Sequence, residues 1–189
     1  MDTKQKILSS ALSMFAVNGY NHVSIRDIAH SVGIKESSIY YHFQNKQDIF
    51  DHLLADIKSQ IQLKKEHFSH RFSNVTEVTE EEFIAVALHY RHTFFEAEPF
   101  VQFIGMLSIE RLSNSNAELV FQELIFNMPL EHQENIFRQM MERGIFQATD
   151  ARLLAKEYHY AVYSAFIDKS SDQDLSALIQ RIYRREIIQ

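Results

Sequence analysis

The chain of 189 residues contains no cysteine, which excludes disulfide bonds, thiolate metal sites and thiol redox sensing. With only four glycines and two prolines, it has few turns, and long helices are favoured. No apolar run is long enough to cross a bilayer, and the N-terminal sequence lacks the apolar stretch of a secretory signal. We therefore expect a soluble, cytoplasmic, all-α protein.

Positive charge is also scarce. The net charge of the whole chain is −6, which is unusual for a protein that binds nucleic acid. Residues 1–60 carry six Lys/Arg and six Asp/Glu, so the acidic excess lies entirely in residues 61–189. A neutral segment can still bind nucleic acid if backbone amides, hydroxyls and helix N-termini supply the phosphate contacts.

Residues 24–46 have the pattern of two short helices joined by a tight turn. Apolar residues of the first helix recur at helical spacing and form one stripe: Ile25, Ile28, Ala29 and Val32. Ser24 followed by Asp27 is a plausible N-terminal cap, and Gly33 falls where the chain must reverse, a position that favours positive φ. A second helix, polar on one side, begins near Lys35. This pattern is typical of a helix-turn-helix motif, whose second helix enters the major groove of DNA.

The rest of the chain also has helical spacing, with one helix expected at about 3–17 and another after Asn45. A polar stretch at 64–78 without a clear period suggests a loop or a frayed helix end. Later helices are expected to begin at or beside Thr79, Pro99, Ser115 and Pro129, and the last two at roughly 150–168 and 172–188. The sequence thus predicts a three-helix helix-turn-helix head at 1–47, for DNA binding. A larger helical bundle at 48–189 would bind a ligand and dimerise.

A specific ordered set of short motifs occurs between residues 3 and 54. In chain order these motifs are Ile7 to Phe15, Asn18-Gly19-Tyr20, Ser24 to Ala29, Val32-Gly33-Ile34, Ile39 to Phe43, and Asn45-Lys46. In this set the segment resembles the tetracycline-repressor-like (TetR) family of bacterial transcription regulators. The resemblance implies a homodimer whose last two helices form a four-helix interface. It also implies that a ligand in each C-terminal bundle changes the spacing of the two DNA-reading helices.

Motif position and resemblance together predict these DNA-contacting residues: Ser24, Lys35, Glu36, Ser37, Ser38, Tyr40, Tyr41, His42 and Lys46. By resemblance, Ser24 would contact phosphate, and one tyrosine of the pair would pack inward while the other faces DNA. His42 and Lys46 would reach phosphates, and Lys46 at a helix start opposes the helix dipole, which favours an anionic partner. Two alternatives stay open: a simple N-cap for Ser24, and an electrostatic helix-start role for Glu36.

Phenylalanine and methionine gather in the middle of the chain. Ordinary core packing explains most of them, but such a bundle could also enclose an apolar pocket with a few polar groups. We expect a small hydrophobic or amphipathic effector there. The candidate pocket residues are His89, Tyr90, Thr93, Phe94, Phe103, Met106, Glu110, Phe121, Met128, Tyr158 and His159.

The last two predicted helices carry broad apolar stripes that a single chain would cover poorly, so we expect self-association. The predicted interface residues are Leu154, Tyr158, Ala161, Val162, Ala165, Leu175, Leu178, Ile179 and Ile182.

The function we expect is a DNA-binding regulator that responds to such an effector. Two alternative functions stay open. His89, His92 and Glu96 could converge on a metal ion in a metal-dependent regulator, although solvated or hydrogen-bonded histidines are far commoner. The neutral head also permits a helical hydrophobe-binding protein that has lost DNA binding. No nucleophile elbow, phosphate loop or suitably framed carboxylate pair is present, so we expect neither an enzyme nor a cofactor.

Overall fold

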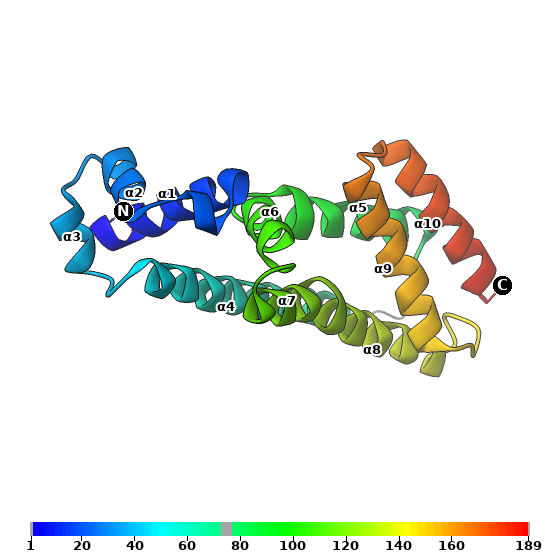
Figure 1. Ribbon diagram of the computed structural model, residues 1–189. Coiled ribbons are helices and arrows are strands. Elements are labelled where there is room, and N and C mark those ends of the chain that lie inside the picture. Colours follow the sequence, from blue (N-terminus) through cyan, green and yellow to red (C-terminus); the bar gives the residue numbers. More distant parts are fainter. Residues whose placement is uncertain (1, 73–76, 189) are drawn as a thin grey trace. The chain divides into compact units, whose positions relative to one another are not determined.

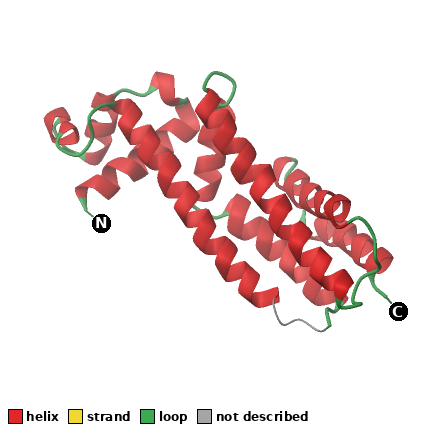
Figure 2. Cartoon of the chain, turned by 90° about the horizontal axis from the view of Figure 1, so that it is seen from below, coloured by secondary structure: helices red, strands yellow, loops and turns green. Residues whose placement is uncertain are grey.

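The computed structural model describes residues 2–72 and 77–188, and these ranges are helical with short connections (Figure 2). An isolated antiparallel bridge joins Phe146 and Ile187. The chain forms two compact units, Met1–Gln62 with Glu98–Glu123, and Leu63–Ala97 with Leu124–Gln189. None of the helices in the described ranges combines the length and apolarity that a membrane crossing needs.

The first unit contains the predicted head. Its elements are α1 (Thr3–Asn18), the 3₁₀ turn η1 (Tyr20–His22), α2 (Ile25–Val32), α3 (Glu36–Tyr40), the first part of α4 (Lys46–Phe72), α6 (Phe100–Glu110) and α7 (Ser115–Gln122). In Figure 1, α6 lies against the C-terminal end of α1. The core of the unit includes Ile7, Phe15, Ile28, Ile39, Phe43 and Phe50. The predicted boundary at residue 47 falls inside this unit and stays a prediction.

The second unit is built on the later helices. Its elements are α5 (Glu80–Arg91), the π-helical segments η2 (His92–Glu96) and, from Leu124, η3 (Glu123–Asn127), then α8 (Met128–Glu142), α9 (Ala151–Ile167) and α10 (Asp172–Glu186). Side chains of α10 join it to α5. The hydroxyl of Tyr183 donates to the carbonyl of Val78 at 2.7 Å, and Arg184 pairs with Glu80.

Most of the predicted helix starts are confirmed by their caps. Ser24 and Thr79 each form a complete capping box with the acidic residue three positions later. Asn45 caps α4 by accepting a hydrogen bond from the amide of Asp48 at 2.9 Å. Gly33 adopts the left-handed conformation, with φ 75° and ψ 32°, as the turn required.

Three local predictions were wrong. Helix α4 continues to Phe72, so of the two predicted alternatives for this stretch, a loop or a frayed helix end, the loop is wrong for residues 64–72, while 73–76 lie outside the described residues. Asn114, not Ser115, caps α7, because its side chain reaches two backbone amides. The sequence Asn18-Gly19 at the end of a helix predicts a left-handed cap, but Gly19 has a positive φ of 78° with an extended ψ of 153° and does not form one. A side chain at Gly19 would also come within 3.1 Å of Ile109.

The turn that precedes α2 is held by two buried or half-buried charged side chains of the same unit. The amide of Tyr20 donates to Glu110 Oε1 at 2.7 Å, and Glu110 is only 4% exposed. Lys46 Nζ donates to the carbonyls of Tyr20 and Val23 at 2.7 and 2.8 Å. Hydrogen bonds to charged partners are stronger than neutral ones, so this turn and the start of α2 are fixed to α6 and α4.

The second unit contains a buried polar cluster among aromatic rings. His159 on α9 is fully buried, and its Nδ1 lies 3.2 Å from the Tyr90 hydroxyl of α5. Burial lowers the pKa of His159 to about 4, against a weaker opposing effect of the Ile125 backbone. Burial also raises the pKa values of Tyr90 and Tyr158. These side chains are therefore uncharged at neutral pH.

Replacing Glu110 by leucine leaves the Tyr20 amide without its acceptor and should lower the free energy of unfolding by about 1–3 kcal/mol. Glu110→Gln keeps an acceptor oxygen and should lose less. Urea denaturation of the three proteins measures the difference. Equal stability of Glu110→Leu and the unaltered protein would show that this hydrogen bond contributes nothing.

Acid should destabilise the protein partly through His159. The folded imidazole stays neutral down to a pKa of about 4, whereas the unfolded chain binds a proton near the ordinary value of 6.5. Between these values the unfolded state binds more protons, so stability falls as the pH decreases from 6.5 to 4, by up to about 3 kcal/mol.

Unfolding measured across this pH range checks the effect. His159→Phe should flatten the profile, while His30→Phe, which changes an exposed histidine, should leave it unaltered. If the profiles of the unaltered protein and His159→Phe run parallel, this assignment is wrong.

Candidate nucleic-acid interface

The helix-turn-helix geometry predicted from residues 24–46 is present. Helix α2 begins at the Ser24 capping box, Gly33 reverses the chain, and α3 follows with its N-cap at Lys35. Ile28 and Ile39 are fully buried and hold the two short helices against the core of the unit. Because α3 has only five residues, this burial orients it while its polar side stays outward.

The predicted DNA-contacting side chains lie mostly on the surface of the unit. The exposed residues are Ser24, Lys35, Glu36, Ser37, Tyr40 and Tyr41. Ser38, His42 and Lys46 are half-buried. The polar side of α3 is therefore available to a partner, which is the condition for insertion into a DNA groove.

The tyrosine pair differs from the prediction that one ring packs inward. Tyr40 is 56% exposed and Tyr41 is 86% exposed. Ile39 and Phe43 occupy the buried positions on either side of the pair, so neither tyrosine is needed in the core. The Tyr41 ring instead packs edge-on against the ring of His42, with 5.1 Å between the ring centres.

Ser24 already uses the groups that were predicted to contact phosphate. Its amide and hydroxyl both donate to Asp27 Oδ2, at 2.8 and 2.6 Å. These hydrogen bonds lower the pKa of the Asp27 carboxyl. The N-cap alternative for Ser24 is thus present, and a phosphate at this position would have to compete with Asp27.

Lys46 has an internal role that the sequence did not indicate. Its ammonium lies 4.1 Å from the centre of the Tyr20 ring and donates to two backbone carbonyls. Burial lowers the pKa of Lys46, and the nearby Glu110 carboxylate opposes this shift. A cation at a helix start is unfavourable, and the sequence predicted that a phosphate would compensate this cost. In the structure the two carbonyls of Tyr20 and Val23 compensate it instead. Phosphate contact by Lys46 stays a prediction.

Arg26 was not among the predicted contact residues, yet it lies beside α3. Its guanidinium is 84% exposed and 3.9 Å from the Glu36 carboxylate, which is 51% exposed. Such an exposed pair contributes little to stability, so both side chains are free to rearrange toward a partner. The sequence did contain a sign of this role: Arg26 lies in the first turn of α2, close after the N-cap Ser24.

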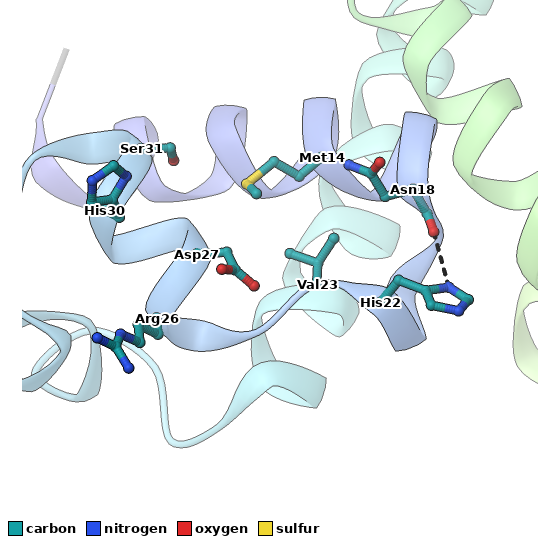
Figure 3. Close-up of a pocket in the computed structure, with 8 residues that line it drawn as sticks. All are labelled: Met14, Asn18, His22, Val23, Arg26, Asp27, His30 and Ser31. Atoms are coloured by element: carbon teal, nitrogen blue, oxygen red, sulfur yellow. Dashed lines mark hydrogen bonds between the residues drawn. The ribbon is translucent and has the colours of Figure 1, made fainter.

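Arg26 also lines a hollow of about 600 Å³ beside α1 and α2 (Figure 3). The other lining residues are Met14, Asn18, His22, Val23, Asp27, His30 and Ser31. His22 Nδ1 is hydrogen-bonded to the Asn18 carbonyl at 3.2 Å. This hollow lies in the head and contains none of the predicted effector-pocket residues.

The predicted pocket residues fall into two groups. Phe103, Met106, Glu110 and Phe121 belong to the first unit, where Glu110 holds the Tyr20 amide. The second unit contains His89, Tyr90, Thr93, Phe94, Met128, Tyr158 and His159. Of these, Tyr90 and His159 are hydrogen-bonded to each other, and Tyr158 is buried close by.

The metal hypothesis is not supported. Among the side chains that the structure describes, which leave out residues 61 and 64–76, no group of three potential ligands is arranged to hold an ion. His92 lies 3.8 Å from Glu96, but His89 is directed to Thr93 at 3.5 Å.

The expectation that one chain would cover the last two helices poorly was also wrong. Seven of the nine predicted interface residues are buried within their own chain: Leu154, Tyr158, Val162, Ala165, Leu175, Ile179 and Ile182. Ala161 is half-buried and Leu178 is 44% exposed. The exposed apolar side chains of α9 are instead Leu153, Tyr160 and Ile167.

Comparison with known proteins agrees with this geometry. Residues 7–53 match the model of bacterial regulatory proteins of the tetR family. Over 47 residues the chain is 43% identical to IcaR, the negative transcriptional regulator of the biofilm operon icaADBC in Staphylococcus epidermidis. That match covers 25% of this chain and 25% of IcaR, so it spans a quarter of the relative's length.

Solved structures share the fold over nearly the whole chain. A structure described as a TetR-family transcriptional regulator from Mesorhizobium loti has a TM-score of 0.76 and 17% identity, and the match covers 98% of this chain and 96% of the other. NalD, the secondary repressor of the MexAB-OprM multidrug efflux pump in Pseudomonas aeruginosa, has a TM-score of 0.69 and 22% identity, with 98% and 95% covered. The helix-turn-helix, its family match and this shared fold lead to one conclusion: residues 7–53 match the tetR family of bacterial regulatory proteins, and the chain has the fold of these solved structures.

Proposed function

We propose that this chain is a DNA-binding transcriptional regulator that acts in the cytoplasm as a repressor. The observation that carries the proposal is the outward polar side of α3, where Lys35, Glu36 and Ser37 are exposed and Tyr41 is 86% exposed. Helix-turn-helix proteins read base edges with the N-terminal residues of this second helix. IcaR, which is similar over the same segment, is a negative regulator, and this likeness supports repression.

The contacts divide by their chemistry. Lys35, Ser37 and Ser38 at the start of α3 would donate to guanine or to phosphate, and Glu36 would accept from cytosine N4. Arg26 beside the start of α3, together with Tyr40, Tyr41 and His42 at its C-terminal end, would position the protein on the DNA backbone. With a neutral head, affinity depends on such positioned donors rather than on a broad basic surface.

A regulator of this kind reads a pseudo-palindromic operator as a homodimer, with its two α3 helices about 34 Å apart. Exposed apolar residues on α9 supply a dimer surface. Leu153, Tyr160 and Ile167 are 56%, 47% and 58% exposed and recur every seven residues, so they lie on one side of the helix. Leu178 on α10 is 44% exposed and extends the apolar surface available for self-association.

The effector would be a small, largely hydrophobic molecule bound in the second unit. A ligand that prefers one conformation of the dimer shifts the equilibrium toward it, and by linkage changes the affinity for DNA. We propose that the effector releases the operator. The Tyr90–His159 cluster supports a site there, because it combines aromatic surface with a few polar groups.

Tyr41→Ala should reduce operator affinity about tenfold or more, since it removes an exposed side chain from the DNA-facing end of the motif. The operator is first selected from a random duplex library, and affinity is then measured by fluorescence anisotropy. Leu112→Ala is the matched control, because Leu112 is also 86% exposed but lies outside the motif.

Salt dependence separates this function from a hydrophobe-binding protein with an inactive head. Real phosphate contacts give a linear fall of log affinity with log salt concentration. If no duplex is selected, or if Tyr41→Ala binds as tightly as the unaltered protein, the assigned surface is incorrect.

Ile167→Glu should dissociate the dimer, because it places a charge in the apolar surface of α9 without entering the core. Sedimentation or light scattering should change from twice the chain mass of 22.2 kDa to that mass. Leu119→Glu is the control: Leu119 of α7 is 69% exposed, against 58% for Ile167, and this change should leave the dimer intact. A monomeric unaltered protein would refute the proposed dimer.

A further inference from the structure

The buried cluster around His159 has features that packing alone does not explain. The His159 and Tyr163 rings are stacked, with an angle of 3° between their planes. The centre of the His159 ring also lies 6.2 Å from that of Phe95 and 6.0 Å from that of Phe126. Phe126 and Tyr163 are half-buried, so the aromatic cluster extends from the buried imidazole toward the surface of the second unit.

Gln133 of α8 adds an unsatisfied acceptor to this cluster. The residue is 7% exposed, and its side chain hydrogen-bonds the Tyr90 hydroxyl. Within the described residues, its Oε1 oxygen has no hydrogen-bond partner. Nearly all buried polar atoms in native proteins are paired, so an unpaired oxygen among rings marks a position where a donor from outside the chain would be stabilised.

The cluster offers no charge to a ligand. The Gln133 amide does not ionise, and Tyr90 and His159 are uncharged at neutral pH, since burial raises the pKa of Tyr90 and lowers that of His159. The neighbouring Arg91 is neutralised by Glu96 at 2.9 Å and by Asp172. A charged ligand would therefore lose its hydration without gaining a counterion.

Two π-helical segments supply part of the cluster. Phe95 lies in η2 and Phe126 in η3, and both segments occur where the chain passes between the two compact units. Single π-helical turns are rare within helical proteins and are frequent at functional sites.

We propose that this cluster recognises an uncharged aromatic molecule whose hydroxyl or N–H group donates a hydrogen bond to Gln133 Oε1. Its ring would pack against the half-buried rings of Phe126 and Tyr163, next to the buried imidazole of His159. This inference rests on the proposed function, for which the molecule would be the effector, and it specifies the chemical class: a phenol-like compound rather than an aliphatic acid or a cation.

Binding of phenol, toluene and choline to the full chain without DNA tests the proposal, measured by ligand-observed NMR titration. Phenol and toluene have nearly the same shape, but only phenol can donate. Phenol should bind about tenfold more tightly than toluene, which is the effect of pairing one buried acceptor. Choline, a cation suited to aromatic faces alone, should bind more weakly than phenol.

Gln133→Met should reduce the preference for phenol over toluene to about twofold or less while toluene binding is kept. Gln139→Met, an exposed position on the same helix, should keep the full preference. Equal binding of phenol and toluene to the unaltered protein would overturn the proposal, and this comparison needs no variant to fold. Tighter binding of choline than phenol would also overturn it.

The result is independent of the regulator assignment, because no DNA is present in the titration. Phenol binding by a protein that selects no duplex would keep the site and remove the proposed function. Operator binding by a protein that does not bind phenol would do the reverse.

Discussion

The anchoring of one short turn controls the part of the structure on which DNA binding depends. The backbone of residues 20–23 precedes α2, and it is held by Glu110 of α6 and Lys46 of α4 through charge-assisted hydrogen bonds. Once this turn is fixed, the Ser24 cap starts α2 and Gly33 sets the direction of α3. A helix as short as α3 is unstable alone, so its orientation depends on the burial of Ile39 and on the position of α2, which this anchored turn precedes.

The same head combines a neutral net charge with the proposed phosphate-binding surface. Lys46 is committed to backbone carbonyls and the amide of Ser24 to Asp27, so neither is a free donor in this conformation. The side chains of Arg26, Lys35 and Tyr41 are left exposed.

In the second unit, by contrast, polar atoms are buried among aromatic rings. An unpaired acceptor there is costly, so a ligand that supplies the matching donor would be bound selectively.

Much of the architecture could be predicted because it rests on local rules. Caps at Ser24 and Thr79, the left-handed Gly33 and the helical spacing of apolar residues involve neighbours a few positions apart. Predictions failed where several positions could satisfy the same pattern. Tyr40 and Tyr41 both stay exposed because Ile39 and Phe43 already occupy the buried positions. The apolar residues of the last two helices are covered by their own chain, which helical periodicity cannot distinguish from a dimer surface.

By itself the sequence determined the all-α class, the helix-turn-helix and its outward polar helix, because capping, turn conformation and amphipathic spacing are properties of short segments. Only the tertiary structure decided that Lys46 and Glu110 share one turn, that Arg26 lies beside α3, and that Gln133 meets Tyr90 and His159. Arg26 and Glu36 are ten residues apart along the chain, and the other groups are separated by tens of residues. Their proximity results from the packing of whole helices, and the energy of a buried charge or hydrogen bond depends on that packing rather than on spacing in the sequence.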